Sequence, residues 1–233
     1  MEEKIMRTPI IAGNWKMNKT PAEAKELVNE LKPLVADANA TVVVCVPFVD
    51  LCPVLKAVEG TNIHVGAQNV HFKESGAYTG EISAAMLKEM GVEYVIIGHS
   101  ERRQYFGETD ATVNLRTLAA VKAGLTPIIC VGERKEEREA GYTNALVEYQ
   151  TLIALNGLTA TDEQANETIG VIRAAIERKY GKEVSDAIRI QYGGSMNPKN
   201  VKGLMAQPEI DGGLIGGASL KAEDFSLVVN YDK

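Results

Sequence analysis

The sequence has few cysteines, and nothing in their spacing indicates a disulfide framework or a metal site. The three cysteines, Cys45, Cys52 and Cys130, are odd in number, and no Cys-x-x-Cys pair or cysteine–histidine cluster is present. Cys45 and Cys130 lie in apolar runs, which is typical of buried thiols in a reducing compartment. We therefore expect no bound metal.

Basic charge and long hydrophobic runs are also scarce. The net charge is −6 and no run of basic residues occurs, so we expect neither a nucleic-acid partner nor an anionic membrane surface. No apolar stretch approaches the roughly 18 residues of a membrane-spanning helix. Residues 1–6 lack the apolar centre of a signal peptide. These absences predict a cytoplasmic protein.

What the sequence does contain is an alternation of short apolar runs with amphipathic segments. The run Thr41–Val46 is continuously apolar and rich in valine, which is typical of a strand buried on both faces. The alternation predicts a parallel sheet, and its length favours one (β/α) barrel domain over residues 1–233. The expected strands are 9–13, 41–46, 62–67, 94–98, 126–131, 188–192 and 213–216. The expected helices include 21–34, capped by Thr20, then 84–90, 110–122, 198–205 and one from Lys221.

The alternation fails over residues 133–187, where no strand is predicted. Residues 136–156 fit an amphipathic helix, with Leu146, Tyr149 and Ile153 at spacings of three and four. Thr161 is the expected N-cap of a second helix over 162–180. Two consecutive helices with so short a link leave no room for a strand, so about one strand of the barrel is missing.

Polar residues follow the carboxyl ends of the predicted strands, where barrel active sites are built. Lys16, after the first strand, is placed to bind a phosphate or an oxyanion, although taken alone it is more typical of a solvated surface. His99 follows the fourth strand where a helix begins, which disfavours the imidazolium and leaves a donor for a substrate carbonyl. Glu101 is either a base, a partner for Lys16 or part of a salt-bridged turn.

Glycine pairs follow the last two predicted strands, in Tyr192-Gly193-Gly194-Ser195 and Ile215-Gly216-Gly217-Ala218. Glycine lets backbone N–H groups approach an anion closely, and a following helix N-terminus favours negative charge. Phosphate sites recur at these two loops of barrels. The simpler alternative is a pair of glycine turns selected for tight geometry.

Together these motifs resemble the triose-phosphate isomerase family, in the family's own order. The matching stretches are AGNWKMN (12–18), GAQN (66–69), TGEI (79–82), IGHSERR (97–103), CVGE (130–133), YGGS (192–195) and GGASL (216–220). The resemblance implies a (β/α)8 barrel. It also implies interconversion of dihydroxyacetone phosphate and glyceraldehyde 3-phosphate through an enediolate, in glycolysis and gluconeogenesis, with no cofactor.

The resemblance assigns roles to individual residues of the site. Asn14 and Lys16 would contact the substrate, His99 would be the electrophile, and Glu101 would support Lys16. This family's histidine is itself a well-known example of an imidazole kept neutral by a helix N-terminus. The phosphate would be held by backbone N–H groups of Ser195, Gly216 and Gly217.

The resemblance also implies a homodimer. Thr79 would lie at the tip of a loop that docks into the second subunit. Glu81 and Arg102 would pair across that interface.

The chain departs from the family at one place. After Glu133 and the next helix, the family has a strand ending in Ala-Tyr-Glu-Pro, whose glutamate is the base, followed by a lid. Here family-like flanks meet between Ala160 and Thr161, and the join resembles a deletion of that strand, base and lid. The stretch 149–151 is no degenerate copy, because no Gly-Thr-Gly or tryptophan follows it and it lies too close to Glu133.

We therefore expect a barrel of this family that lacks one strand. It should be open or distorted between the strands at Thr126 and Ile188, or completed by a partner chain. Two functional readings remain: an isomerase whose turnover is severely impaired, and a non-catalytic phosphate-binding or structural deletion variant. A different barrel enzyme that reuses the phosphate loops is disfavoured by the motifs around His99 and Lys16.

Overall fold

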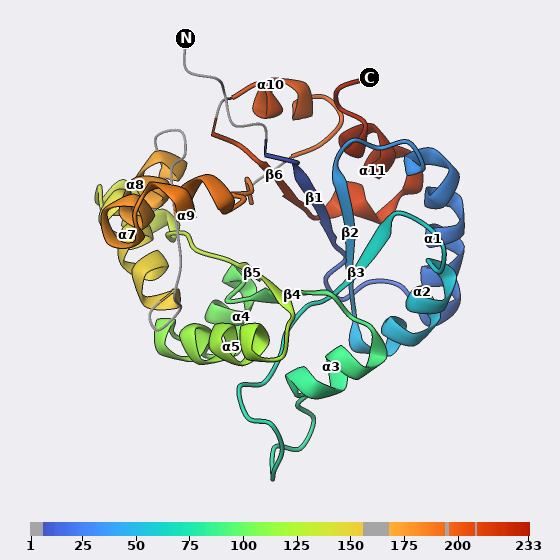
Figure 1. The fold of residues 1–233 in the computed structure, drawn as a ribbon, viewed down its shortest axis with the longest axis horizontal. Coiled ribbons are helices and arrows are strands. Elements are labelled where there is room, and N and C mark those ends of the chain that lie inside the picture. The colour runs from blue at the N-terminus through green and yellow to red at the C-terminus, as the bar shows by residue number, and fades with distance from the viewer. Residues whose placement is uncertain (1–6, 156–167, 194–195, 208) are drawn as a thin grey trace.

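A curled sheet of parallel strands forms the centre of the molecule (Figure 1). The computed structural model describes residues 7–155, 168–193, 196–207 and 209–233. The strand order is β5-β4-β3-β2-β1-β6, and each neighbouring pair is parallel. The strands are β1 (Ile10–Asn14), β2 (Thr41–Val46), β3 (Ile63–Ala67), β4 (Tyr94–Ile97), β5 (Thr126–Ile129) and β6 (Gly212–Ile215).

Helices cover the outer face of this sheet. In Figure 1, α7, α8 and α9 lie together on the side of the molecule away from α1 and α2. The helices are α1 (Pro21–Val35), α2 (Leu51–Ala57), α3 (Ala84–Met90), α4 (Ser100–Tyr105), α5 (Asp110–Lys122), α6 (Lys135–Glu139), α7 (Thr143–Ala154), α8 (Thr168–Tyr180), α9 (Lys182–Ala187), α10 (Val201–Met205) and α11 (Ala222–Val229). Thr20 is the N-cap of α1 as predicted, and the Glu23 carboxylate accepts its backbone N–H at 2.8 Å.

Burial on both faces explains the continuous apolar run in β2. Val42, Val44 and Val46 belong to the core between the sheet and the helices. Val43 and Cys45 point to the opposite face, where they form a smaller core with side chains of neighbouring strands. Successive side chains of a strand alternate between its two faces, so both faces must be apolar when both are covered.

The sheet does not close between β5 and β6. Among the described residues, β5 pairs with β4 alone, and its residues are only half-buried or exposed. The segment 188–192, predicted as a strand, makes one isolated parallel bridge, from Tyr192 to Gly213. Three backbone hydrogen bonds of 2.9–3.0 Å hold its residues Ile190 and Tyr192 against residues 211–214. The predicted opening is confirmed for the described residues, and the missing neighbour explains why 188–192 is only a bridge.

Three helices after β5 differ from the prediction: one is split in two, one was not predicted and one is shorter. The single helix expected over 136–156 is two helices, α6 and α7, because Gly141 takes a left-handed conformation (φ 79°) between them. Helix α8 is described from Thr168, while the expected cap at Thr161 and the join at Ala160 lie outside the described residues. Helix α9, which the sequence analysis did not predict, begins directly after Gly181. The helix expected over 198–205 is present only as α10.

Candidate active site

The carboxyl ends of β1 and β4 bring the predicted polar residues together. Lys16 Nζ donates a hydrogen bond to Glu101 Oε1 at 2.7 Å, and the two side chains form an ion pair. The other Glu101 oxygen, Oε2, lies 3.5 Å from His99 Nδ1. Asn14 follows in β1, and its Oδ1 accepts the backbone N–H of Lys16 at 3.1 Å. Two loops far apart in sequence therefore supply one cluster.

The tautomer of His99 follows from its backbone contact. The Glu101 N–H donates to His99 Nδ1 at 3.2 Å, which assigns the lone pair to Nδ1 and the proton of the neutral ring to Nε2. Burial lowers the pKa of His99, Lys16 lowers it further, and Glu101 opposes them without reversing the shift. His99 also stands at the N-cap of α4, where the helix dipole disfavours a cation. The site therefore favours a neutral imidazole whose proton is on Nε2.

Lys16 takes an uncommon backbone conformation. Its φ is 55°, in the left-handed region that side-chain-bearing residues rarely adopt. Gln68 holds this turn, because its Nε2 donates at 3.0 Å to the carbonyl oxygens of both Lys16 and Cys45. The sequence analysis quoted Gln68 within a motif but gave it no role. A residue keeps a strained backbone conformation where the contacts around it hold that conformation in place, and such residues are common at functional sites.

The glycine loop after β6 lies beside the lysine. A Cβ built on Gly216 would be 3.8 Å from Lys16 Cε, and nothing lies near the corresponding position of Gly217. The Gly216 carbonyl accepts the Ser219 N–H at 2.9 Å, which closes the turn at Gly217–Leu220. Ser195, the third residue expected to hold phosphate, lies outside the described residues. Among the described residues, the glycine loop and Lys16 thus share one side of the site.

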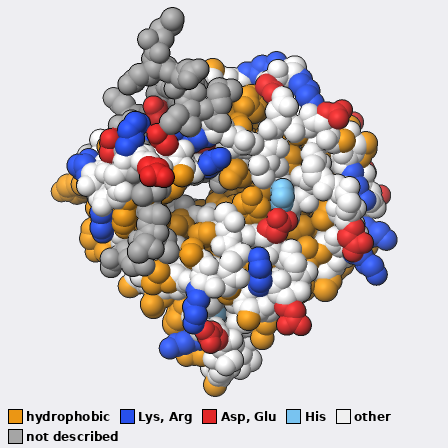
Figure 2. Space-filling view, viewed as in Figure 1, with side chains coloured by type: hydrophobic (Ala, Val, Ile, Leu, Met, Phe, Trp, Pro, Cys, Tyr) orange, Lys and Arg blue, Asp and Glu red, His pale blue; other side chains and the backbone are white. Residues whose placement is uncertain are grey.

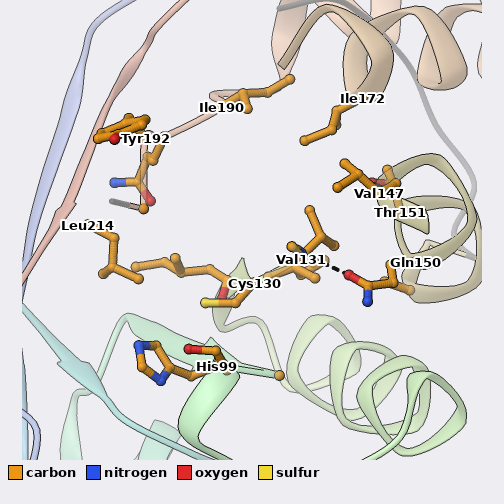
Figure 3. A pocket seen from close by; sticks show the side chains of 18 of the residues that line it. His99, Cys130, Val131, Val147, Gln150, Thr151, Ile172, Ile190, Tyr192 and Leu214 are labelled. Carbon is orange, nitrogen blue, oxygen red and sulfur yellow. Dashed lines mark hydrogen bonds between the residues drawn. The ribbon is translucent and has the colours of Figure 1, made fainter. Parts of the chain in front are cut away.

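A cavity of about 1780 Å³ occupies the gap in the barrel. Figure 3 shows His99 and Cys130 at one side of it and Ile190, Ile172 and Val147 at the other. In Figure 2 the gap is visible as an opening into the molecule, bordered by hydrophobic side chains. Small-molecule sites usually occupy about 300–1,000 Å³, so this space is too large for a triose alone.

Carboxylates line this cavity, but the described ones all have basic partners. Burial raises the pKa of Glu133, yet hydrogen bonds from its own backbone, from Arg138 and from Thr143 outweigh burial and leave that pKa lowered. The pKa of Glu137 is lowered by hydrogen bonds from Arg134. The ion pairs are Glu108–Arg102 at 2.5 Å, Asp110–Arg103 at 2.5 Å, Glu133–Arg138 at 2.6 Å and Glu137–Arg134 at 2.8 Å. None of these groups is a free base facing His99.

The cysteines differ in their surroundings. Cys45 is fully buried as predicted, and burial raises the pKa of its thiol. Cys130 is only half-buried, because it follows β5 at the open edge of the sheet, and burial raises its pKa to about 12. Cys52 is exposed. Over the described ranges, no group of three or more metal-ligating side chains is found, and no helix has the length and apolarity to span a membrane.

The loop around Thr79 (residues 72–82, the Thr79 loop) is ordered by aromatic contacts. The ring of His71 lies 4.3 Å from that of Tyr78, centroid to centroid. Glu81, expected to pair with Arg102 across an interface, lies 3.7 Å from Arg116 of its own chain. Arg102 is paired with Glu108. Met17 and Phe106, near the active-site cluster in sequence, are 97% and 67% exposed.

Comparison with known proteins agrees with this geometry. The family model described as Triosephosphate isomerase matches residues 9–159 and 152–232, two stretches that meet beside the join at Ala160. A Triosephosphate isomerase of Clostridium botulinum is 58% identical over 248 residues, covering 97% of this chain and all of the relative. One from Acetivibrio thermocellus is 56% identical over 251 residues, covering 98% and 100%.

Both alignments are longer than the 233 residues of this chain, so each relative has positions without a counterpart here. A crystal structure of triosephosphate isomerase from Bartonella henselae superposes with a TM-score of 0.88 at 38% identity. That match covers 98% of this chain and 100% of the other. The likeness extends over the whole chain, and the extra positions of the relatives lie within it.

Proposed function

The chain belongs to the triosephosphate isomerase family, and from that membership we propose that its site binds a small phosphorylated triose and polarises the triose carbonyl. The reaction would be the interconversion of dihydroxyacetone phosphate and glyceraldehyde 3-phosphate, in glycolysis and gluconeogenesis, with no cofactor. We propose that its turnover is severely impaired. Residues 1–233 would act as one barrel domain in the cytoplasm.

The electrophilic half of the reaction would rest on His99 and Lys16. When a proton leaves the carbon next to a carbonyl, the electron pair moves to the oxygen and an enediolate forms. The neutral His99 would donate its Nε2–H to that oxygen, and the Lys16 ammonium, held at 2.7 Å by Glu101, would stabilise the developing charge. Asn14 would contact the substrate and fix the Lys16 turn.

The phosphate would bind on the glycine side of the site. Backbone N–H groups of Gly216 and Gly217, with Ser195, would form the cradle, and Lys16 beside Gly216 would add positive charge. A single lysine close to both the phosphate loop and His99 would orient the two ends of the substrate. The substrate would then lie beside Lys16 and Gly216, at the edge of the larger cavity and not deep inside it.

One observation carries the proposed impairment: every described carboxylate that lines the cavity is paired with an arginine. Glu101 is paired with Lys16. Proton abstraction needs a positioned base with an accessible lone pair, and general-base catalysis contributes roughly 10²–10⁴ in rate. The family's glutamate and lid belong to the segment that the sequence analysis found missing at Ala160–Thr161. The proposal is that the loss of this segment removed the base.

A homodimer through the Thr79 loop is part of the proposal. The loop is exposed at Tyr78, and exposed apolar side chains at Met17 and Phe106 offer surface to a docking loop. These elements follow β1, β3 and β4, each of which pairs with a parallel strand on both sides. Sedimentation at micromolar concentration tests this, and a clean monomer contradicts it.

The alternative is a non-catalytic phosphate-binding variant, and the open barrel favours it. Both readings require anion binding, so calorimetry with 2-phosphoglycolate, whose carboxylate represents the enediolate, tests what they share. We expect weak binding, at least tenfold weaker than that of the Clostridium botulinum relative measured alongside. Affinity equal to the relative's contradicts the proposed loss of the lid, and no binding contradicts both readings.

A further inference from the structure

The gap in the barrel is bounded on one side by an unpaired strand edge. Thr126 in β5 and Cys130 directly after β5 donate their backbone N–H groups to the carbonyl oxygens of Glu93 and Ile97 at 2.8 Å, so both residues turn these groups toward β4 and its flanks. Backbone groups of successive strand residues point to opposite edges. The carbonyl groups of Pro127 and Ile129 therefore face the gap, together with the N–H group of Ile129. Pro127 has no N–H to offer, and proline is tolerated on a strand edge.

The segment 188–192 forms the other side of the gap, and its chain runs in the same direction as β5. Ile190 and Tyr192 turn their backbone groups toward residues 211–214, which places those of Arg189 and Gln191 on the gap side by the same alternation. The bridge from Tyr192 to Gly213 is parallel, as is the pairing of β5 with β4. Both edges thus present backbone hydrogen-bonding groups to the gap.

The space between the edges has an apolar wall. Helices α7 and α8 contribute Val147 and Ile172, and the flanks of the gap contribute Val131 and Ile190, whereas Gln150 and Thr151 add two polar side chains from α7 (Figure 3). The cavity of about 1780 Å³ exceeds what a small ligand fills. An apolar wall between two rows of backbone donors and acceptors suits an extended peptide, because its main chain satisfies the rows and its alternate side chains meet the wall.

The position of the gap also indicates its occupant. Each relative contains positions that have no counterpart here, and the two stretches of the family match overlap over residues 152–159, which begin in the last turn of α7. We propose that the cleft between β5 and the segment 188–192 binds one extended apolar peptide, parallel to β5. This inference does not depend on the proposed function, because it rests on the edges, the wall and the place of the relatives' extra positions.

Fluorescence anisotropy with a labelled synthetic peptide tests the proposal. The peptide carries the residues of the Clostridium botulinum relative that have no counterpart in this chain. A matched peptide is N-methylated at alternate residues, which removes donors along one edge and keeps every side chain. We expect saturable binding of the first peptide at micromolar concentration, and binding at least tenfold weaker for the second. Equal binding of the two peptides, or no saturable binding, overturns the proposal.

Variants of the protein give an independent control. Ile172→Asp places a charge in the wall and should weaken binding at least tenfold, whereas Leu227→Asp, at a 58% exposed position on α11, should leave it unchanged. Circular dichroism checks that both variants fold. Sedimentation identifies the other possible occupants. If the protein is a dimer and does not bind the peptide, a second copy of the chain fills the gap. If the protein is a monomer and does not bind the peptide, another part of the same chain fills the gap. Either result overturns the proposal.

Discussion

Lys16 and Glu101 form an ion pair of 2.7 Å between the carboxyl ends of β1 and β4, and the same glutamate donates its backbone N–H to His99. Glu101 is thereby committed to positioning the lysine and the imidazole. Its Oε1 accepts a hydrogen bond from the Lys16 ammonium and its Oε2 lies 3.5 Å from His99, so both carboxylate oxygens are engaged within the site. In the proposed function, the described part of the site would stabilise negative charge on a substrate, and it contains no unpaired carboxylate that would create that charge.

Replacing Lys16 should weaken anion binding. Lys16→Met removes a charged hydrogen-bond donor, which is worth about 1.5–3 kcal/mol, or roughly tenfold to a hundredfold in the dissociation constant. The measurement is calorimetric titration with 2-phosphoglycolate. Lys19→Met is the matched control, because Lys19 also has a positive φ (75°) but no described contact with Glu101. Equal loss in both variants contradicts a specific role for Lys16.

His99 should titrate below the ordinary histidine pKa. Burial and Lys16 lower its pKa, so protonation is less favourable in the folded chain than in the unfolded chain. The contribution of His99 to stability is therefore present at neutral pH and declines as the pH falls below about 6.5. NMR titration, with the signal assigned through His99→Asn, measures the shift. A midpoint at or above about 6.5 contradicts the assignment of a buried neutral ring.

Breaking the buried pair of Arg173 should destabilise the fold. The Arg173 side chain is 1% exposed, and it donates to Asp211 at 2.5 Å and to the carbonyl oxygens of Ser185 and Ile188. These contacts of Arg173 hold α8 against α9 and against the start of β6. Arg173→Met should lower the free energy of unfolding by about 3 kcal/mol. Urea unfolding measures this, with the exposed Arg178→Met on the same helix expected to change it by under about 1 kcal/mol.

Removing the charge of Asp50 should stabilise the protein at neutral pH. The Asp50 side chain is fully buried, and neither carboxylate oxygen has a partner among the described residues. Burial raises its pKa, and the nearby Glu23 adds to the shift. The folded state therefore favours the protonated form, so this penalty is absent at low pH and grows as the pH rises through the folded-state pKa.

We expect Asp50→Asn to raise the free energy of unfolding by about 1 kcal/mol or more at pH 7. The gain should vanish near pH 3, where the wild-type carboxyl is already protonated. Urea unfolding at the two pH values measures it. A gain that is equal at both values contradicts the charge as its cause.

The sequence predicts strands well where burial on both faces leaves a continuous apolar run. Thr41–Val46 and Tyr94–Ile97 were identified for that reason. The segment 188–192 alternates apolar and polar residues instead, and it pairs only through Tyr192, because strand formation depends on neighbours that lie elsewhere in the chain. The split of the predicted helix 136–156 depends on the conformation of Gly141, and glycine tolerates both helical and left-handed geometry.

In the site, the sequence identifies residues by their place after strands. Lys16, His99 and Glu101 were found in this way, and the structure brings them into contact. Gln68 was missed as a positioning group because its partners are backbone carbonyls of two loops, which leave no trace in side-chain spacing. Arg103, which donates to the Gly98 carbonyl at 2.8 Å, was missed for the same reason.

The central claim is that the electrophilic half of the site is retained and the base is absent, and turnover tests it most directly. A coupled isomerase assay would compare the purified chain, prepared from a host without its own isomerase, with the Clostridium botulinum relative. Lys16→Met serves as the baseline. We expect kcat/KM at least about 10³-fold below the relative's, from loss of the base and of lid closure. Turnover equal to the relative's, and abolished by Lys16→Met, would contradict the claim.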